Sequence, residues 1–265
     1  MLYMTNVYKS FNIGTPVQKD ALINFNLHLK KGDFVTVIGG NGAGKSTMLN
    51  AIAGSFGVEN GNIVIAGNDV TKDPAYKRAA YIGRVFQDPL LGTAGDMWIE
   101  ENLAMALRRG KKRSFRWGIS NKEREQFVEM LKTLDLGLET RLDSKVGLLS
   151  GGQRQALTLL MATIKQPELL LLDEHTAALD PKTAQKVLDI TNKVVTENQL
   201  TTLMITHNMK DAIRYGNRLI MMHNGSIIYD VSGEEKQKLK VADLMAKFEE
   251  ESGGEFANDR MMLAH

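Results

Sequence analysis

The chain of 265 residues contains no cysteine and no long uninterrupted apolar segment. The absence of cysteine excludes disulfide bonds and thiolate metal sites, and it is compatible with a reducing compartment. No segment approaches the roughly 18 consecutive apolar residues that a membrane-spanning helix needs. The first residues, MLYMTNVYKSF, lack the charged start and hydrophobic run of a secretory signal. We therefore expect that the chain does not itself cross a bilayer.

The chain also has little net charge. Its 33 basic residues are almost balanced by 31 acidic ones, so the overall charge gives no reason to expect a nucleic-acid partner. A chain of this length with 43% hydrophobic residues can bury a complete α/β core made of two or three closely packed subdomains. We find no internal repeat, which predicts a single functional unit per chain.

A glycine-rich segment follows an apolar run near the N-terminus. The run 34–38 (FVTVI) predicts a strand, and GGNGAGKST at 39–47 comes directly after it. Glycines in such a turn allow positive φ, so that successive backbone N–H groups can point at an anion. Lys45 adds a positive charge, Ser46 can bind Mg²⁺, and the helix that should begin here directs its positive end at the same ligand. The turn therefore predicts a site for a nucleoside triphosphate, contacted by Gly39, Gly40, Asn41, Gly42, Ala43, Gly44, Lys45, Ser46 and Thr47.

A second helix start has the features of an anion site. The sequence LSGGQ at 149–153 precedes a broad apolar stripe that predicts a buried helix ending near Pro167. Ser150 is a natural N-cap, and the glycines after it leave backbone N–H groups uncovered. The alternative is an ordinary glycine-containing cap without a ligand. One nucleotide could contact both helix starts only if the fold or a second copy of the chain brings them together; the residues concerned are Ser150, Gly151, Gly152 and Gln153.

Charged and polar residues follow three further predicted strands. The run ELLLLDE at 168–174 predicts a buried strand that ends in Asp173, placed to hold Mg²⁺ through water, and Glu174, placed to polarise an attacking water molecule. The run TTLMIT at 201–206 ends at His207, which could sense a γ-phosphate. The run YIGRVF at 81–86 precedes Gln87, whose amide could reach the metal or the water. The alternatives are surface carboxylates, a structural histidine and a solvent-facing glutamine.

These residues together resemble the ATP-binding cassette of ABC transporters, from about residue 2 to about residue 245. The segment 39–46 matches the Walker A motif, 149–153 the signature and 169–174 the Walker B motif. Gln87 stands at the Q-loop, Asp180 in the D-loop and His207 at the switch histidine. The resemblance implies an α/β P-loop NTPase fold with a RecA-like parallel core, an antiparallel β subdomain and an α-helical signature subdomain.

The same resemblance implies which aromatic residue contacts the base. Phe11 stands where the family places a ring against adenine, and Tyr8 is its nearby competitor. The implied cofactors are ATP and Mg²⁺, and the implied activity is ATP hydrolysis. Two copies would close head to tail, so that Ser150 and the residues after it contact the γ-phosphate held by Lys45 of the other copy. We therefore expect a homodimer upon ATP binding.

The resemblance also implies partners. We expect transmembrane permease subunits, a solute-binding protein in the same system, no nucleic acid, and a cytoplasmic position on the inner face of the membrane. The segments 81–106 and 173–184 look most like those of bacterial importers of small organic solutes such as amino acids. The cassette of a split exporter, and a soluble ABC ATPase acting on nucleic acid or ribosomes, are the alternatives. A P-loop kinase would give no reason for the LSGGQ sequence or for His207.

The expected domain organisation is one ABC ATPase domain over 1–248. Its core and antiparallel layer cover 1–91 and 155–248, and a helical subdomain covers 92–154, with amphipathic helices at 97–107 and 122–134. Residues 249–265 are predicted to be a polar tail that is mobile or loosely packed, with no added regulatory domain. The basic segment 108–118 is interpreted as a solvated loop, with contact to anionic headgroups or the membrane partner, or to nucleic acid, as alternatives.

Two smaller expectations complete the interpretation. The segment 218–230 predicts a hairpin that turns at Asn224-Gly225, followed by a helix that includes 241–248. His175 stands where the family often has proline. It is either a simple loop residue or a second titratable group that tunes the pH dependence of Glu174.

Overall fold

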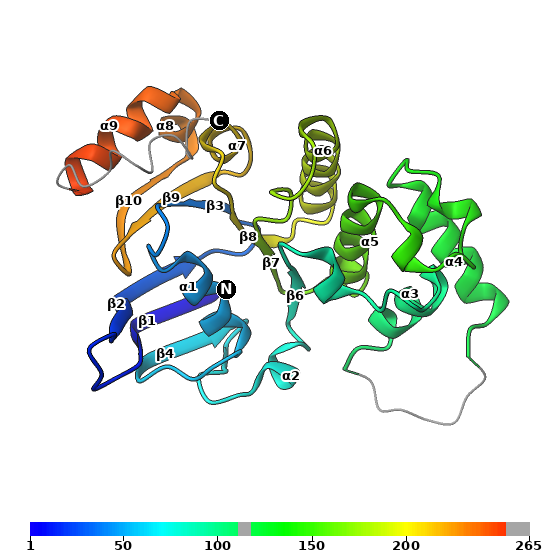
Figure 1. The fold of residues 1–265 in the computed structure, drawn as a ribbon, viewed down its shortest axis with the longest axis horizontal. Helices are drawn as coiled ribbons and strands as arrows, with labels where there is room; N and C mark the ends of the chain where they lie inside the picture. Colours follow the sequence, from blue (N-terminus) through cyan, green and yellow to red (C-terminus); the bar gives the residue numbers. More distant parts are fainter. Residues whose placement is uncertain (111–117, 253–265) are drawn as a thin grey trace.

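The computed structural model describes residues 1–110 and 118–252, and a six-stranded sheet forms their centre (Figure 1). The strand order is β10-β9-β3-β8-β7-β6, and all neighbours are parallel except the β9–β10 hairpin. This arrangement confirms the predicted parallel core. The strands cover Phe34–Ile38 (β3), Ile82–Val85 (β6), Leu169–Asp173 (β7), Thr201–Ile205 (β8), Arg218–His223 (β9) and Ser226–Ser232 (β10).

The central strands are short apolar runs because both faces of the sheet are covered. Every residue of β3 and β8 is buried, as are the first four residues of β7. Since parallel strands all end at the same edge, the segments after β3, β6, β7 and β8 meet there. The predicted phosphate turn, Gln87, Glu174 and His207 follow these four strands in turn.

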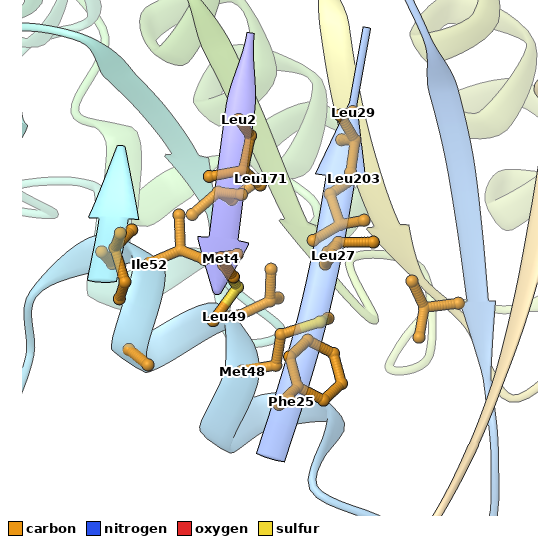
Figure 2. Close-up of a cluster of buried hydrophobic side chains, with 14 of the residues drawn as sticks. Leu2, Met4, Phe25, Leu27, Leu29, Met48, Leu49, Ile52, Leu171 and Leu203 are labelled. Atoms are coloured by element: carbon orange, nitrogen blue, oxygen red, sulfur yellow. The ribbon is translucent and has the colours of Figure 1, made fainter. Parts of the chain in front are cut away.

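A second, antiparallel sheet covers the helix that follows the phosphate turn. Its strand order is β2-β1-β4-β5. In Figure 2, side chains of β1 and β2 such as Met4 and Phe25 face Met48 and Leu49 of α1. Side chains of β7 and β8 belong to the same core cluster, so α1 is held by both sheets. These elements cover Leu2–Phe11 (β1), Lys19–Leu29 (β2), Asn60–Ile65 (β4), Asn68–Asp69 (β5) and Lys45–Ala53 (α1).

The helices α3 and α4 lie at the end of the molecule opposite β10 (Figure 1). They share an apolar cluster with α5, to which Leu103, Phe127 and Leu157 contribute. In the part of the chain that the structure describes, no helix is both long and apolar enough to cross a membrane. The helices cover Ala75–Arg78 (α2), Ile99–Leu107 (α3), Asn121–Lys132 (α4), Gly151–Thr163 (α5), Pro181–Glu197 (α6), Met209–Arg214 (α7), Gly233–Lys238 (α8) and Val241–Ser252 (α9).

Several element ends differ from the sequence-based expectations. The predicted boundary between 154 and 155 falls inside α5, and α9 continues to Ser252, past the predicted end of the domain at 248. Asn60-Gly61, a dipeptide typical of turns, lies in β4. Gly61 lies so close to β1 that an added β-carbon would be 2.4 Å from the Asn6 carbonyl oxygen. Residues 111–117 of the basic segment and 253–265 of the predicted tail lie outside the described residues.

Candidate functional site

The predicted phosphate turn forms one wall of a hollow of about 340 Å³. Glu174 and His207 reach this hollow from the ends of β7 and β8, and Phe11 reaches it from the end of β1. Segments that are up to 196 positions apart in the chain therefore meet at one site. The lining residues are Phe11, Lys19, Ala21, Asn41, Gly42, Ala43, Gly44, Lys45, Ser46, Thr47, Glu174 and His207.

The turn requires glycine at two positions for steric reasons. A β-carbon at Gly39 would lie 2.3 Å from the Met222 carbonyl oxygen, and one at Gly44 would lie 2.5 Å from the Ala21 carbonyl oxygen. Both glycines also have positive φ, 153° and 98°. Lys45 is buried, and its Nζ donates to the carbonyl oxygens of Gly39 (2.7 Å) and Gly40 (3.0 Å). The hydrogen bonds of Lys45 therefore stabilise the turn in a conformation that can surround an anion.

Glu174 and His207 contact each other at the strand edge. Glu174 Oε1 lies 2.5 Å from His207 Nε2. Glu174 has φ of 46°, a conformation that costs a non-glycine residue free energy and that turns its side chain out of the line of β7. Its backbone N–H donates to the Ile205 carbonyl oxygen (3.2 Å), which ties this turn to β8. The pair is thus placed where a carboxylate can orient a water molecule and an imidazole can donate to a phosphate oxygen.

Asp173 is largely buried beside a cation of the protein itself. Arg84 Nη2 lies 3.4 Å from Asp173 Oδ2 and 2.8 Å from Asn50 Oδ1, and its guanidinium stacks 4.5 Å from the centre of the Phe86 ring. Burial raises the pKa of Asp173, and Arg84 counteracts that shift. Ser46 lines the hollow and Asp173 does not. Both carry oxygen donors of the kind that Mg²⁺ takes, together with phosphate oxygens and several waters.

The LSGGQ sequence caps α5 on a different part of the surface. Ser150 Oγ accepts from the Gln153 N–H (3.3 Å), and Gln153 Oε1 accepts from the Ser150 N–H (3.2 Å), which is a capping box. Gly151 and Gly152 follow without side chains over the helix start. None of these residues lines the hollow that holds Lys45. Within one copy of the described chain, the two predicted anion sites are therefore separate.

Comparison with known proteins decides the family. A family profile described as ABC transporter matches residues 22–177. The tyrosine transport ATP-binding protein of Clostridioides difficile is 44% identical over 94% of this chain and 99% of its own length. The chain belongs to the ABC transporter family. It is an ATP-binding subunit with ABC-type ATPase activity.

Further relatives and solved structures agree with this assignment. The thiamine import ATP-binding protein of Yersinia pseudotuberculosis is 34% identical over 78% of this chain and 82% of its own length. A dimeric ATP-binding cassette in a post-hydrolysis state, bound to ADP and Pi, matches with a TM-score of 0.74 and 32% identity, over 88% of this chain and 98% of that one. An ABC transporter cassette in its ADP conformation matches with a TM-score of 0.78 and 28% identity, over 96% of this chain and 99% of that one.

In this ABC ATPase, Phe11 and not Tyr8 lines the hollow. Phe11 is 36% exposed and contacts the edge of Phe56 with ring centres 5.4 Å apart. An aromatic ring that is partly exposed, and whose orientation is held by a neighbouring ring, can stack against a base. Tyr8 comes three residues earlier in β1, where it pairs with Asn60 of β4. The geometry therefore favours Phe11 among the two candidates for the adenine contact.

The ABC motif residues Gln87 and Asp180 do not line the hollow. Gln87 is exposed after β6, at the same sheet edge. Asp180 caps α6, where its Oδ1 accepts from the Thr183 N–H (3.1 Å). Hydrogen bonds from the Thr183 side chain and, to a smaller extent, from its backbone N–H lower the pKa of Asp180. A role for either side chain at a nucleotide therefore stays a prediction.

His175 is a buried residue of the ATPase. Its Nε2 lies 3.0 Å from Thr191 Oγ1 on α6, and burial lowers the pKa of His175 to about 4. The ring is therefore neutral at physiological pH. This finding argues against the interpretation that His175 tunes the pH dependence of Glu174.

Two residues at the site had no signal in the sequence. Lys19 lines the hollow although it stands in an ordinary polar stretch, and Arg84 reaches Asp173 from a neighbouring strand. Only the pairing of β2 with β1, and of β6 with β7, brings these cations to the site. A basic residue in or just before a strand is too common to be singled out by its sequence position.

Proposed function

We propose that this ABC ATPase powers import of a small organic solute, such as an amino acid, through separate permease subunits. The names of two relatives, tyrosine transport and thiamine import ATP-binding proteins, support this solute class. A solute-binding protein in the same system would deliver the solute. The chain would lie on the inner face of the membrane and contact the permease rather than the lipid.

The observation that carries the proposal is the separation of the two anion sites. The phosphate turn opens into the hollow, whereas Ser150 and Gly151 are exposed on the helix start of α5. A head-to-tail pair of chains would place the α5 start of one copy over the γ-phosphate in the other. Each ATP would then be shared, so nucleotide binding would close the dimer and hydrolysis would reopen it.

The residues of the hollow would divide the chemistry as follows. Lys45 and the N–H groups of the turn bind the β- and γ-phosphates, and Phe11 stacks on adenine. Ser46 and, through water, Asp173 would hold Mg²⁺, which would supply positive charge beside the phosphates. Glu174 accepts a hydrogen bond from the attacking water and so directs its oxygen at the γ-phosphorus. The other proposed contacts are the His207 imidazole to the γ-phosphate, Gln87 to the metal or the water, and Asp180 with Ser150, Gly151, Gly152 and Gln153 across the dimer.

The permease would dock on the helical part of the molecule. A groove of about 350 Å³ next to α3 is lined by Trp98, Met105 and Ile119, together with Glu100, Glu101 and Arg124. Trp98 and Met105 are exposed apolar side chains, as are Leu90 and Leu91 close to Gln87. Apolar side chains with a charged rim are typical of a protein-binding surface. Contact next to Gln87 would connect the permease to the ATP site.

The shared site can be tested by its dimer. In a Glu174→Gln background, which slows hydrolysis, we expect ATP with Mg²⁺ to convert the monomer into a dimer, measured by light scattering after size exclusion. Ser150→Arg should abolish this dimer because a large cation would replace the small cap at the shared phosphate. Ser120→Arg is the matched control, because Ser120 caps α4 with the same kind of capping box that Ser150 forms at α5. An ATP-induced dimer in the Ser150→Arg variant would contradict the proposal.

The transport role needs a separate test. The tagged chain is purified from detergent-solubilised membranes, and its partners are identified by mass spectrometry. Polytopic permease subunits are the expected partners. Co-sedimentation with ribosomes or DNA in place of a membrane partner would favour the soluble ABC ATPase alternative and overturn the proposal.

A further inference from the structure

Lys19 lies directly opposite the proposed base-stacking residue. It opens β2, and its Cα pairs with that of Phe11 at the end of β1. Both residues line the hollow that contains the phosphate turn. The β1–β2 pairing therefore places one aromatic ring and one cation at the same end of the site.

The ammonium group of Lys19 lies over the phosphate turn. A β-carbon added at Gly42 would be 2.7 Å from Lys19 Nζ. Lys45 contacts the same turn from its buried side, through the carbonyl oxygens of Gly39 and Gly40. Two lysines thus approach the turn from different directions: Lys45 is buried, and Lys19 is exposed to the solvent.

The charge of Lys19 is available for a ligand. The neighbouring carboxylate, Asp20, accepts instead from Ser10 Oγ (2.7 Å) and Gln18 Nε2 (3.3 Å). Within residues 1–110 and 118–252, no carboxylate forms an ion pair with Lys19. A free ammonium at the open side of an anion cradle is suited to bind phosphate oxygens.

We propose that Lys19 binds the phosphates nearest the nucleoside, so that affinity for ADP as well as for ATP depends on its charge. The position along the nucleotide follows from the Phe11 pairing, and this step rests on the proposed stacking of adenine on Phe11. Glu174 and His207 would define the γ-phosphate end of the hollow, whereas Lys19 extends from the strand end that holds the base. Removing Lys19 should therefore weaken the binding of both nucleotides.

The test compares nucleotide affinity in Lys19→Ala and Lys19→Arg with that of the unmodified chain. Calorimetry measures the Kd of ADP, and that of ATP in the Glu174→Gln background. We expect Lys19→Ala to raise both Kd values by about five- to tenfold, the effect of one exposed charge-assisted hydrogen bond. Lys19→Arg should retain most of the affinity, and the loss in Lys19→Ala should shrink at high salt.

The controls separate this proposal from simpler explanations. Lys30→Ala removes an exposed lysine just beyond the other end of β2 and should leave both Kd values unchanged. The melting temperature of Lys19→Ala without nucleotide should equal that of the unmodified chain. An ADP Kd within twofold of the unmodified value, a loss confined to ATP, or an equal loss in Lys30→Ala would each overturn the proposal. Phe11→Ala is measured in parallel: unchanged affinity there would refute the adenine placement and, with it, the assignment of Lys19 to the phosphates nearest the nucleoside.

Discussion

At the scale of single residues, Arg84 shows how the protein stabilises its buried carboxylate. The guanidinium contacts Asp173 on β7 and Asn50 on α1, and it stacks on Phe86 just before Gln87. Burial lowers the pKa of Arg84, but nearby Asp173 opposes that shift. Arg84 therefore neutralises part of the charge of Asp173, and we infer that Mg²⁺ would share this role when it binds there.

The Arg84→Met variant tests this role. It should lower the free energy of unfolding without nucleotide by about 1–3 kcal/mol, because Asp173 loses its cation. Mg²⁺ with ADP should stabilise the variant more than it stabilises the unmodified chain, as measured by thermal melting. Arg214→Met removes an exposed pair with Asp189 and should change stability by less than about 0.5 kcal/mol. If Mg²⁺ and ADP stabilised Arg84→Met and the unmodified chain equally, Mg²⁺ would not replace the charge that Arg84 supplies to Asp173.

His175 makes stability depend on pH. Its pKa is about 4 in the folded chain and near its ordinary value of 6.5 in the unfolded chain, so the unfolded state binds more protons between these pH values. Stability is therefore complete above pH 6.5 and is lost as the pH falls toward 4, by up to about 1.4 kcal/mol per unit. Urea titrations of the unmodified chain and of His175→Gln at several pH values should show a difference in stability that narrows in acid. If the difference in stability between the two chains did not change with pH, the pH dependence would not come from His175.

At the scale of elements, α5 and α6 meet through a glycine. A β-carbon at Gly152 would lie 2.1 Å from Thr183 Cγ2, whereas one at Gly151 would lie 3.1 Å from the end of the flexible Leu179 side chain. The glycines of the signature therefore have two uses. They leave the N–H groups of α5 uncovered, and Gly152 lets α6 pack closely against the helix start.

Gly152→Ala is expected to destabilise the chain by about 1–3 kcal/mol through overpacking, even without nucleotide. Chemical denaturation measures this effect. The double variant Gly152→Ala with Thr183→Ser removes the opposing methyl group and should recover most of the loss. If the second substitution gave no recovery, the contact with α6 would not be the cause.

At the scale of the whole molecule, one buried arginine fastens the antiparallel layer to α1. Arg78 Nη1 donates to the carbonyl oxygens of Ala51 (2.6 Å) and Ile52 (2.9 Å), the end of the helix that begins at Lys45. Its other nitrogens donate to the carbonyl oxygens of Thr71 (3.0 Å) and Asp73 (2.8 Å). A cation at a helix C-terminus is favourable because of the helix dipole.

Arg78→Met should lower the free energy of unfolding by about 2–4 kcal/mol, because buried carbonyl groups lose a charged donor. Urea denaturation without nucleotide measures the change. Lys77→Met alters the neighbouring exposed lysine and should cost less than about 0.5 kcal/mol. Similar losses in both variants would show that the four hydrogen bonds of Arg78 are not what holds the layers together.

Much of the sheet could be predicted from the sequence because its strands are continuous apolar runs. The run 34–38 coincides with β3, and the hairpin at Asn224-Gly225 forms with positive φ at both residues, 44° and 76°. The resemblance places Asp180 in the D-loop, yet Asp180 is also the N-cap of α6, the 17-residue helix that begins at Pro181. A motif assigned to chemistry can therefore hide an ordinary helix start.

The phosphate turn, the order of the motifs and the family follow from the amino-acid sequence, because they depend on residue types at short, fixed spacing. Three other contacts became visible only in the folded chain: Lys19 lies over Gly42, Arg84 reaches Asp173, and His175 is buried against Thr191. These contacts join residues on different elements, 16 to 89 positions apart. Strand pairing and helix packing set such distances, and no local pattern encodes them.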